Sequence, residues 1–379
     1  MNLVIDTWKL VKGHGKSIGI YNLTKTLIRY LGEENIRQGS PHNIIVLGNA
    51  YNRTDMEKEG VTFILVPGNP LSRAGYVYWE LFRVVSYAKR FKADRILFPR
   101  GYRPLIYSGK DTIIVHDLIP FWYDQHFPGY LGRIENAYIM NRLKASIAHA
   151  DRVITISDYS RKAIDEMVPG SASRVCRIYN GLNDMDLPAG DTRGPDAGSY
   201  IVSVTSAMPH KNAKGIAAAY NRYCAVCEEK GIKPLSLTVI GIPDVQSFVE
   251  EGILSKGAAR RVTCHAYIEN YADMCRLIRD AKVFLFLSLI EGFGFPPLEA
   301  MQLGTPVVCS DRTSLPEVVG DAGLLVDPDN ADSVADSLLL VQTRQDLADD
   351  LVRKGRRNTE RFTWQSRTKE YWDELFRDN

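Results

Sequence analysis

Short β-branched segments alternate with helical segments along almost the whole chain, and this alternation constrains the fold more than any other feature. Segments such as 43–48 (NIIVLG) and 112–117 (TIIVHD) have the length and composition of buried strands. Between such segments lie stretches with helical periodicity, for example 74–91 and 158–168. This pattern is typical of parallel sheets with helices on both faces, so we predict an α/β fold.

The expected strands form two series separated by a polar segment. The first series comprises residues 3–8, 43–48, 62–68, 95–99, 112–117, 152–157 and 175–181. The second comprises residues 199–205, 236–241, 261–267, 283–288, 305–310 and 323–327. Residues 180–199, between them, are rich in Gly, Pro, Asp and Asn and lack apolar periodicity, which is typical of a domain boundary.

We therefore predict two Rossmann-like, doubly wound domains that face each other across a cleft. The chain has 379 residues, and about 150 residues per domain also suggests two domains. The N-terminal domain is expected over residues 1–182 and the second over 183–360, followed by a helix over 361–379. Ligands of such sheets bind at the carboxyl ends of the strands, so the cleft is the expected site.

Composition excludes several classes of protein. The net charge of +2 gives no nucleic-acid signature, and no apolar run reaches the ~18 residues of a membrane span. The N-terminus lacks the features of a signal peptide, so we expect a cytoplasmic protein. Cys224 and Cys227 form a C-x-x-C inside a helical segment, without the strand that a redox motif needs or the second ligand pair that zinc needs. Reduced thiols are the simpler interpretation.

A glycine-rich stretch, KGHGKSIG over residues 12–19, follows the first expected strand. Gly15, Lys16 and Ser17 match the last three positions of a phosphate-binding P-loop motif. Leu10, however, occupies the position of the first glycine, which this motif requires. Two interpretations remain. The stretch is either a glycine-rich turn before a helix whose N-terminus favours anions, or a plain tight connection.

The segment over residues 283–328 carries the clearest chemical pattern. A buried strand is followed by a turn with two glycines and then by two prolines, which suit a helix N-terminus. The turn residues Gly292, Phe293, Gly294 and Phe295 would present backbone amides to phosphate or sugar oxygens. Two carboxylates, Glu291 and Glu299, frame this turn. On physical grounds alone the glutamates could equally cap the helix.

Residues 291–307 read EGFGFPPLEAMQLGTPV. This segment resembles the signature of the retaining nucleotide-sugar glycosyltransferases of GT-B fold, family four, which include the lipopolysaccharide and exopolysaccharide-type enzymes of group 1. Their hallmark is a glutamate, seven residues, and a second glutamate in this context. Similar segments follow in the expected order over almost the whole chain: IIVHDLIPF (113–121), VITISDYSRKAI (153–164), RIYNGLN (177–183), SVTSAMPHKN (203–212) and FTWQSRTKEYW (362–372).

The resemblance implies a role for each matching residue. His116 would contact the donor sugar, and Lys211 would hold the donor diphosphate together with the amides of the glycine turn. Glu291 would bind sugar hydroxyls, and Glu299 would bind the ribose hydroxyls. The resemblance further implies retention at the anomeric carbon, no metal, no cofactor beyond the nucleotide-sugar substrate, and a final helix that returns towards the N-terminal domain.

The chain departs from the family pattern in two loops. Many relatives carry an arginine shortly before the lysine, whereas here His210 directly precedes Lys211 and would supply a second positive charge only if protonated. Relatives commonly read Ser-Gly-Ile-Gly-Arg-Tyr after the first strand, and residues 16–21 read KSIGIY. Gly19 is therefore the better match, and we expect Gly15, Ser17 and Gly19 to line a glycine-rich turn that faces the cleft.

The expected substrates follow from the resemblance. The nucleobase is expected near Tyr267 and Ile268, where backbone contacts leave no sequence signal that separates UDP from GDP. Similar loops in bacterial polysaccharide enzymes favour hexose transfer from GDP-mannose to a saccharide or lipid-linked saccharide, as in O-antigen assembly. The alternatives are a UDP-sugar-dependent transferase of the same family, a nucleotide-sugar epimerase, and a non-catalytic nucleotide-sugar-binding paralogue.

Residues 87–104 are basic and contain several aromatic residues. The charged members are Lys89, Arg90, Lys92, Arg95, Arg100 and Arg103. Such a stretch could make a peripheral contact with an anionic membrane surface, or it could be a solvated helix face and loop.

Overall fold

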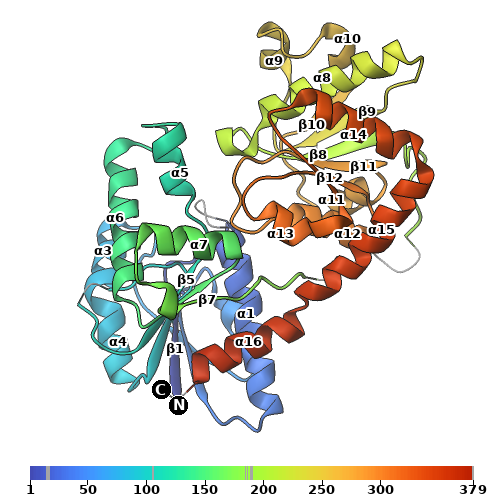
Figure 1. The fold of residues 1–379 in the computed structure, drawn as a ribbon. Helices are drawn as coiled ribbons and strands as arrows, with labels where there is room; N and C mark the ends of the chain where they lie inside the picture. The colour runs from blue at the N-terminus through green and yellow to red at the C-terminus, as the bar shows by residue number, and fades with distance from the viewer. Residues whose placement is uncertain (14–17, 105, 184, 186, 188–190, 378–379) are drawn as a thin grey trace. The chain divides into compact units, whose positions relative to one another are not determined.

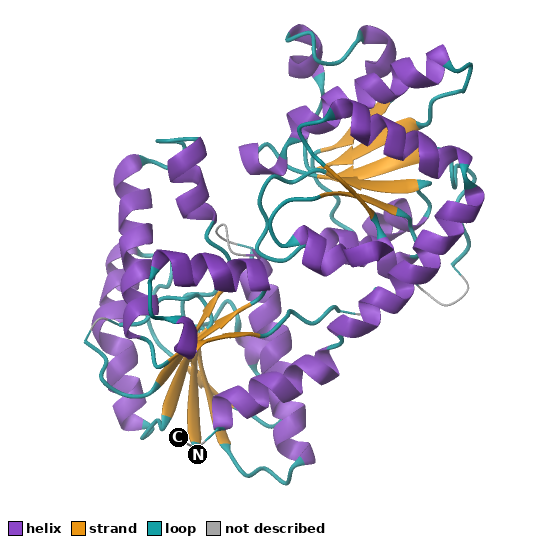
Figure 2. Cartoon of the chain, viewed as in Figure 1, coloured by secondary structure: helices purple, strands orange, loops and turns teal. Residues whose placement is uncertain are grey.

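A computed structural model describes residues 1–13, 18–104, 106–183, 185, 187 and 191–377. The chain divides into two compact units. The N-terminal unit contains Met1–Gly181 and Trp364–Asn379, and the C-terminal unit contains Leu182–Thr363. In each unit a parallel sheet is covered by helices (Figures 1 and 2).

The N-terminal unit is built on a seven-stranded sheet with the order β3-β2-β1-β4-β5-β6-β7. Its strands are β1 (Asn2–Asp6), β2 (Asn43–Gly48), β3 (Thr62–Leu65), β4 (Arg95–Phe98), β5 (Asp111–Val115), β6 (Arg152–Thr155) and β7 (Val175–Arg177). Every neighbouring pair is parallel. The direction of strand addition reverses between β1 and β4, which makes their carboxyl ends the switch point where such sheets bind ligands.

Helices cover both faces of this sheet because successive residues of its strands are buried, as in β4 and β5, so the side chains on each face need a covering layer. Val4, Ile96 and Ile113 face a core that includes Trp79 and Ile147. The helices of this unit are α1 (Ile18–Arg37), α2 (Arg53–Met56), α3 (Arg73–Tyr78), α4 (Val84–Arg90), α5 (Ile119–His126), α6 (Arg133–His149), α7 (Asp158–Met167), the 3-10 turn Ala172–Arg174 and α16 (Trp364–Phe376). The helix expected over 74–91 is α3 and α4 joined by a π-helical segment, Trp79–Arg83.

The last helix belongs to the N-terminal unit, although the C-terminal unit precedes it in sequence. In Figure 1, α16 lies beside α1, and the rings of Tyr30 and Trp364 stack with their centroids 5.5 Å apart. Phe362 and Trp364, together with Tyr371 and Trp372, are buried, so these aromatic side chains serve packing.

The C-terminal unit has a six-stranded parallel sheet with the order β10-β9-β8-β11-β12-β13. Its strands are β8 (Tyr200–Val204), β9 (Ser236–Ile240), β10 (Val262–His265), β11 (Val283–Phe286), β12 (Val307–Ser310) and β13 (Leu324–Val326). Its helices are α8 (Ala213–Glu229), α9 (Gln246–Glu250), α10 (Lys256–Ala259), α11 (Tyr271–Arg279), α12 (Phe295–Leu303), α13 (Leu315–Val319), α14 (Ala331–Thr343) and α15 (Gln345–Thr359), with 3-10 turns at Pro209–Lys211, Gly320–Ala322 and Glu360–Phe362. Here the strand order reverses between β8 and β11, so their carboxyl ends form the second switch point.

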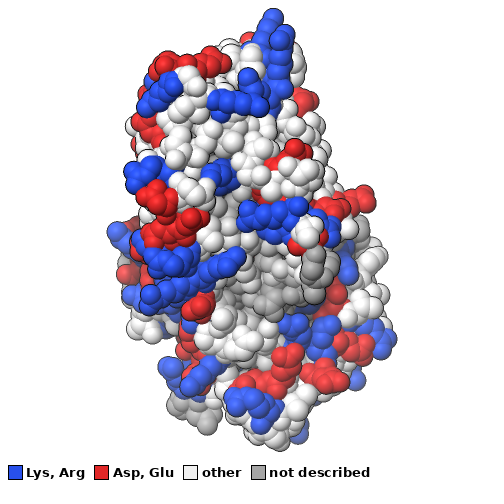
Figure 3. Space-filling view, turned by 90° about the vertical axis from the view of Figure 1, so that its right-hand side faces the viewer, with Lys and Arg blue, Asp and Glu red and all other residues white. Residues whose placement is uncertain are grey.

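The basic stretch over residues 87–104 does not form one exposed surface. Arg95 and Arg103 are only 1% and 6% exposed, and Arg103 pairs with the buried Asp111. These two side chains therefore cannot contact a membrane. On the face drawn in Figure 3, basic and acidic side chains are interspersed. No helix in the described part of the chain is both long and apolar enough to span a bilayer.

Candidate active site

The loop after β8 positions Lys211 at the switch point of the C-terminal unit. Lys211 ends a 3-10 turn, and Asn212 follows it in the left-handed conformation, with φ 55°. The Asn212 side chain caps α8 by accepting the Gly215 amide at 3.0 Å and donates to the Leu287 carbonyl at 3.1 Å. The second bond joins the loop after β8 to the loop after β11.

The loop after β11 forms the glycine turn. Gly294 has φ 123°, and a Cβ there would lie 2.7 Å from a methyl group of Leu315, so both conformation and space require glycine. The Phe293 ring is buried and packs edge-on against Phe362. The structure gives the Gly292 and Gly294 amides no hydrogen bond with the described residues, which leaves these donors available to a ligand.

Lys211 and Glu291 meet between these two loops. The Lys211 Nζ atom donates to Glu291 Oε1 at 2.6 Å, and their side chains are 27% and 12% exposed. A second link holds the loops in register, because the Leu289 amide donates to the His210 carbonyl at 2.8 Å. The site therefore places a positive charge, a carboxylate and backbone amide donors at one edge of the sheet.

Thr313 and Ser314 support the glycine turn and were missed in the sequence. Thr313 adopts the left-handed conformation, with φ 56°, and its Oγ1 accepts the Glu291 amide at 3.1 Å. The buried Ser314 hydroxyl lies 2.7 Å from the Phe293 carbonyl. Both residues follow β12, which neighbours β11, and this neighbourhood is visible only in the folded sheet, so the sequence carried no signal for them.

His210 does not supply a second positive charge. The side chain is only 4% exposed, and burial, with a further contribution from the neighbouring Lys211 charge, lowers its pKa to about 4. The imidazole is therefore neutral at pH 7. Desolvation and a like charge both oppose protonation of His210, while the Glu291 carboxylate favours it, so the ligand-free environment disfavours the protonated form that would replace the missing arginine.

His116 lies directly after β5 in the N-terminal unit. Its Nε2 atom lies 2.7 Å from the Pro99 carbonyl, which can only accept, so Nε2 carries the proton and Nδ1 is the basic nitrogen. Burial lowers the pKa of His116 to about 4, so this ring is also neutral at pH 7. A neutral, oriented imidazole offers a hydrogen-bond acceptor rather than a charge.

Glu299 lies in the second turn of α12, because the helix begins at Phe295. Burial raises the pKa of Glu299 to about 7, and no ion pair to a described residue offsets this effect. Hydroxyl groups of a ligand can donate hydrogen bonds to a carboxylate in this environment, and these bonds stabilise its ionised form.

The raised pKa of Glu299 should make the affinity for a ligand whose hydroxyls donate to this carboxylate pH-dependent. Such hydroxyls favour the ionised form, so lowering the pH from 8 to 6 should raise the Kd of such a ligand about tenfold. The folded-state pKa lies above the ordinary value of 4.5, so the unliganded protein should lose stability as the pH rises from about 4.5 to 7. Calorimetric titration at several pH values measures the binding effect. Glu299→Gln should bind with a flat pH profile; an unchanged profile would show that another group is responsible.

The residues predicted to contact the nucleobase and those predicted to form the glycine-rich turn lie in other loops and helices. β10 ends at His265 rather than at Tyr267, so Tyr267 and Ile268 lie in the following loop, where Tyr267 is 79% exposed. Gly19 lies in the first turn of α1 and not in a turn before it. Gly15 and Ser17 fall outside the described residues.

The described residues contain no group of three or more His, Cys, Asp or Glu side chains that could hold a metal ion. Cys224 and Cys227 lie in α8 as free, buried thiols. The absence of a metal or cofactor requirement stays a prediction.

The sequence matches two family models that together span both units. Residues 23–185 match Glycosyltransferase Family 4, and residues 191–358 match Glycosyl transferases group 1. The chain belongs to the GT-B glycosyltransferases. The matched ranges meet near Leu182, where the two structural units also divide. Lys211 and Glu291 both fall in the part of this glycosyltransferase that matches group 1.

Individual relatives agree with this assignment. The glycosyltransferase is 28% identical to the O-antigen chain mannosyltransferase B of Escherichia coli over 317 residues, which are 76% of this chain and 81% of that protein. Its fold matches a sucrose-phosphate synthase from Thermosynechococcus elongatus with a TM-score of 0.72 at 18% identity, covering 99% of both chains. It also matches Anabaena HepE, solved with UDP-glucose, with a TM-score of 0.68 at 17% identity, again over 99% of both chains.

Proposed function

We propose that this glycosyltransferase is a retaining, metal-independent hexosyltransferase that moves mannose from GDP-mannose to a saccharide or lipid-linked saccharide acceptor. The reaction would serve bacterial polysaccharide or O-antigen assembly at the cytoplasmic face of the membrane. The observation that carries the proposal is the similarity to an O-antigen chain mannosyltransferase over three quarters of the chain.

The C-terminal unit would bind the donor. Negative charge builds on the leaving nucleoside diphosphate as the glycosidic bond breaks, and Lys211 with the Gly292 and Gly294 amides would stabilise it. These donors need no reorganisation, because the bonds of Asn212 and Thr313 hold both loops in place. This positive charge would take the role that a metal has in other sugar-nucleotide enzymes.

Three further side chains and one backbone segment would orient the donor. Glu291 would accept hydrogen bonds from sugar hydroxyls while its second interaction holds Lys211 Nζ. Glu299 would bind the ribose hydroxyls, and backbone near Tyr267 and Ile268 would contact the base. His116, fixed by Pro99, would offer Nδ1 to a hydroxyl of the transferred sugar.

The second candidate is transfer from a UDP-sugar. The fold match to HepE solved with UDP-glucose favours it, and the expected backbone contacts near Tyr267 and Ile268 give no sequence signal that separates GDP from UDP.

The test is a transfer assay with the purified full chain, GDP-mannose and mannose-containing glycoside acceptors, with UDP-glucose and ADP-glucose as alternative donors. We expect product from GDP-mannose and at most traces from the other two. Product from UDP-glucose alone would favour the second candidate. Nucleotide binding without transfer to any acceptor would favour a non-catalytic paralogue.

A further inference from the structure

The backbone of Glu291 is held by the loop after β12. The Glu291 amide donates to Thr313 Oγ1 at 3.1 Å. The Ser314 hydroxyl lies 3.0 Å from the Glu291 carbonyl and 2.7 Å from the Phe293 carbonyl, so its proton is shared between two acceptors. The backbone of Glu291 makes no other hydrogen bond with a described residue. The position of this residue therefore depends on two adjacent hydroxyl groups and on no helix or strand.

The loop that supplies these hydroxyls contains a strained turn. The turn spans residues 312–315 and is closed by the Leu315 amide, which donates to the Arg312 carbonyl at 3.2 Å. Thr313 has φ 56° and Ser314 has φ −81°, which is the pattern of a type II′ turn, whose first central position favours glycine. A β-branched residue at positive φ costs folding free energy, and such strain persists mainly at functional sites, where the surrounding structure maintains it.

Three successive residues of the strained turn contact the glycine turn. Thr313 and Ser314 hold the backbone of Glu291, and Leu315 lies where a Cβ on Gly294 would come within 2.7 Å of its methyl group. Glycine at position 313 would relieve the strain, but it would leave the Glu291 amide without its acceptor. The threonine hydroxyl is therefore the feature that the strain accompanies.

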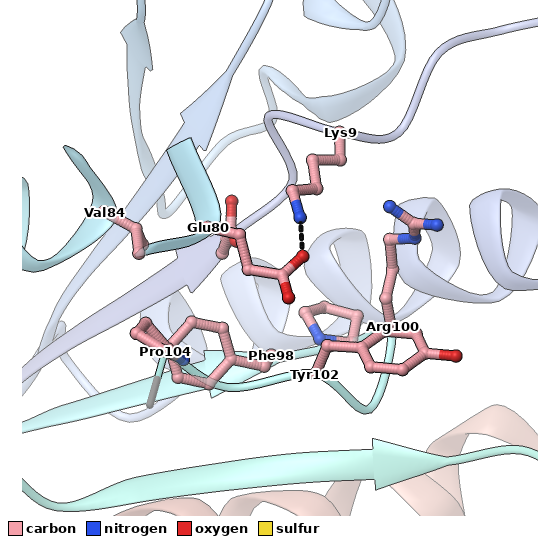
Figure 4. Close-up of a pocket in the computed structure, with 9 residues that line it drawn as sticks. Lys9, Glu80, Val84, Phe98, Arg100, Tyr102 and Pro104 are labelled. Atoms are coloured by element: carbon pink, nitrogen blue, oxygen red, sulfur yellow. Dashed lines mark hydrogen bonds and ion pairs between the residues drawn. The ribbon is translucent and has the colours of Figure 1, made fainter. Parts of the chain in front are cut away.

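The switch point of the N-terminal unit is fixed by charged groups instead. Figure 4 shows Lys9, in the loop after β1, pointing towards Glu80, and Glu80 also pairs with Arg142. All three side chains are less than 10% exposed. The cavity beside them has a volume of about 10 Å³, which is room for about one water molecule. Neutral hydroxyls, by contrast, fix Glu291 without adding a charge that competes with its carboxylate.

We propose that Thr313 is a positioning residue for sugar transfer and acts through Glu291. Its hydroxyl fixes the backbone from which the Glu291 carboxylate reaches Lys211 Nζ at 2.6 Å. This role rests on the proposed transferase function, in which Glu291 binds the transferred sugar. A shift of a reacting or orienting group by about 1 Å can cost about 10²-fold in rate, so a small movement of residue 291 is enough to slow transfer.

Three substitutions of Thr313 separate the hydroxyl from the strain. Thr313→Val keeps the β-branched shape and loses the hydroxyl, so kcat should fall about tenfold or more while the Kd for the donor stays within about threefold. Thr313→Ser keeps the hydroxyl and should retain most of the wild-type kcat. Thr313→Gly has no hydroxyl but tolerates positive φ, so it should melt at a higher temperature than Thr313→Val and transfer as slowly.

Thr305, two residues before β12, provides a matched control at the opposite end of the same strand. Its buried hydroxyl donates to the Ile278 carbonyl at 2.7 Å, within the C-terminal unit but not to the glycine turn. Thr305→Val should lower the melting temperature, because it leaves a buried carbonyl without its donor. Its kcat should stay within about twofold of wild type.

A double-mutant cycle tests whether Thr313 acts through Glu291. In the Glu291→Gln background, Thr313→Val should lower kcat by less than about twofold, because the carboxylate that Thr313 positions is already absent. The assay uses the donor that wild type transfers, and the donor Kd is measured by calorimetric titration.

Four results would overturn the positioning role while leaving the proposed function in place. They are wild-type kcat in Thr313→Val or Thr313→Gly, a loss in Thr313→Ser as large as that in Thr313→Val, equal losses in Thr313→Val and Thr305→Val, and losses in the double-mutant cycle that multiply in full. Absence of transfer by wild type from GDP-mannose, UDP-glucose and ADP-glucose would contradict the proposed function, and the role of Thr313 with it.

Discussion

Replacing Lys211 with alanine should lower the turnover number for mannose transfer by about 10²- to 10³-fold, the effect of removing one fixed donor to a developing anion. Lys211 Nζ is held at 2.6 Å by Glu291 and is three quarters buried, so its charge acts in a poorly screened environment. The leaving diphosphate gains charge only as the bond breaks. The loss should therefore appear mainly in kcat, with a smaller rise in KM for the donor.

Lys214 provides a matched control. It lies one turn further along the chain, in α8, and pairs with Glu251 at 2.8 Å, but both side chains are more than half exposed. Lys214→Ala should leave kcat within about twofold of wild type, because an exposed pair contributes little. Equal losses in the two variants would show that general surface charge, and not the position of Lys211, attracts the donor.

The substitution Glu291→Gln should have the second large effect. We expect kcat to fall about 10²-fold, because a small misplacement of the reacting groups causes a loss of this size. Glutamine keeps the shape but removes the charge that holds Lys211, so both the sugar contact and the lysine position are weakened. The backbone links of residue 291 to Thr313 and Ser314 do not involve its carboxylate, so the turn itself should persist.

Donor affinity and transfer should therefore separate in Glu291→Gln. Calorimetric titration should give a Kd for GDP-mannose close to the wild-type value, while single-turnover transfer is slow. The control Glu251→Gln, which breaks the exposed ion pair with Lys214, should behave as wild type in both assays. Full turnover in Glu291→Gln would remove this residue from the active site.

The sequence predicted the sheets because strand formation depends on local pattern. Each expected strand overlaps an observed one and usually extends a few residues beyond it, as in β5, where the strand ends at Val115 and the predicted segment continues to residue 117. His116 and Asp117 continue the pattern in sequence but turn away from the sheet. The pairing of Lys211 with Glu291 also follows from the fold, because β8 and β11 are neighbours and both residues follow their carboxyl ends.

The features that could not be predicted from the sequence are those that depend on burial and on contacts between residues far apart in the chain. His210 reads as a loop histidine, and only the packed structure shows that it is buried and neutral. In the sequence, Arg95 and Arg103 have the pattern of exposed basic residues. In the structure, Arg103 is buried and forms an ion pair with Asp111 of the adjacent strand β5. Thr313 and Ser314 have no motif of their own and act through backbone groups of the glycine turn.

The most direct test of the central claim is the anomeric configuration of the product made from GDP-mannose. The donor carries an α-linked mannose, and a retaining hexosyltransferase must produce an α-mannoside. NMR of the purified product distinguishes this from the β-anomer through the one-bond coupling at the anomeric carbon. An α-mannoside formed by wild type, and lost in Lys211→Ala, is the predicted result. A β-mannoside, or no transfer from GDP-mannose to any saccharide acceptor, would contradict the account.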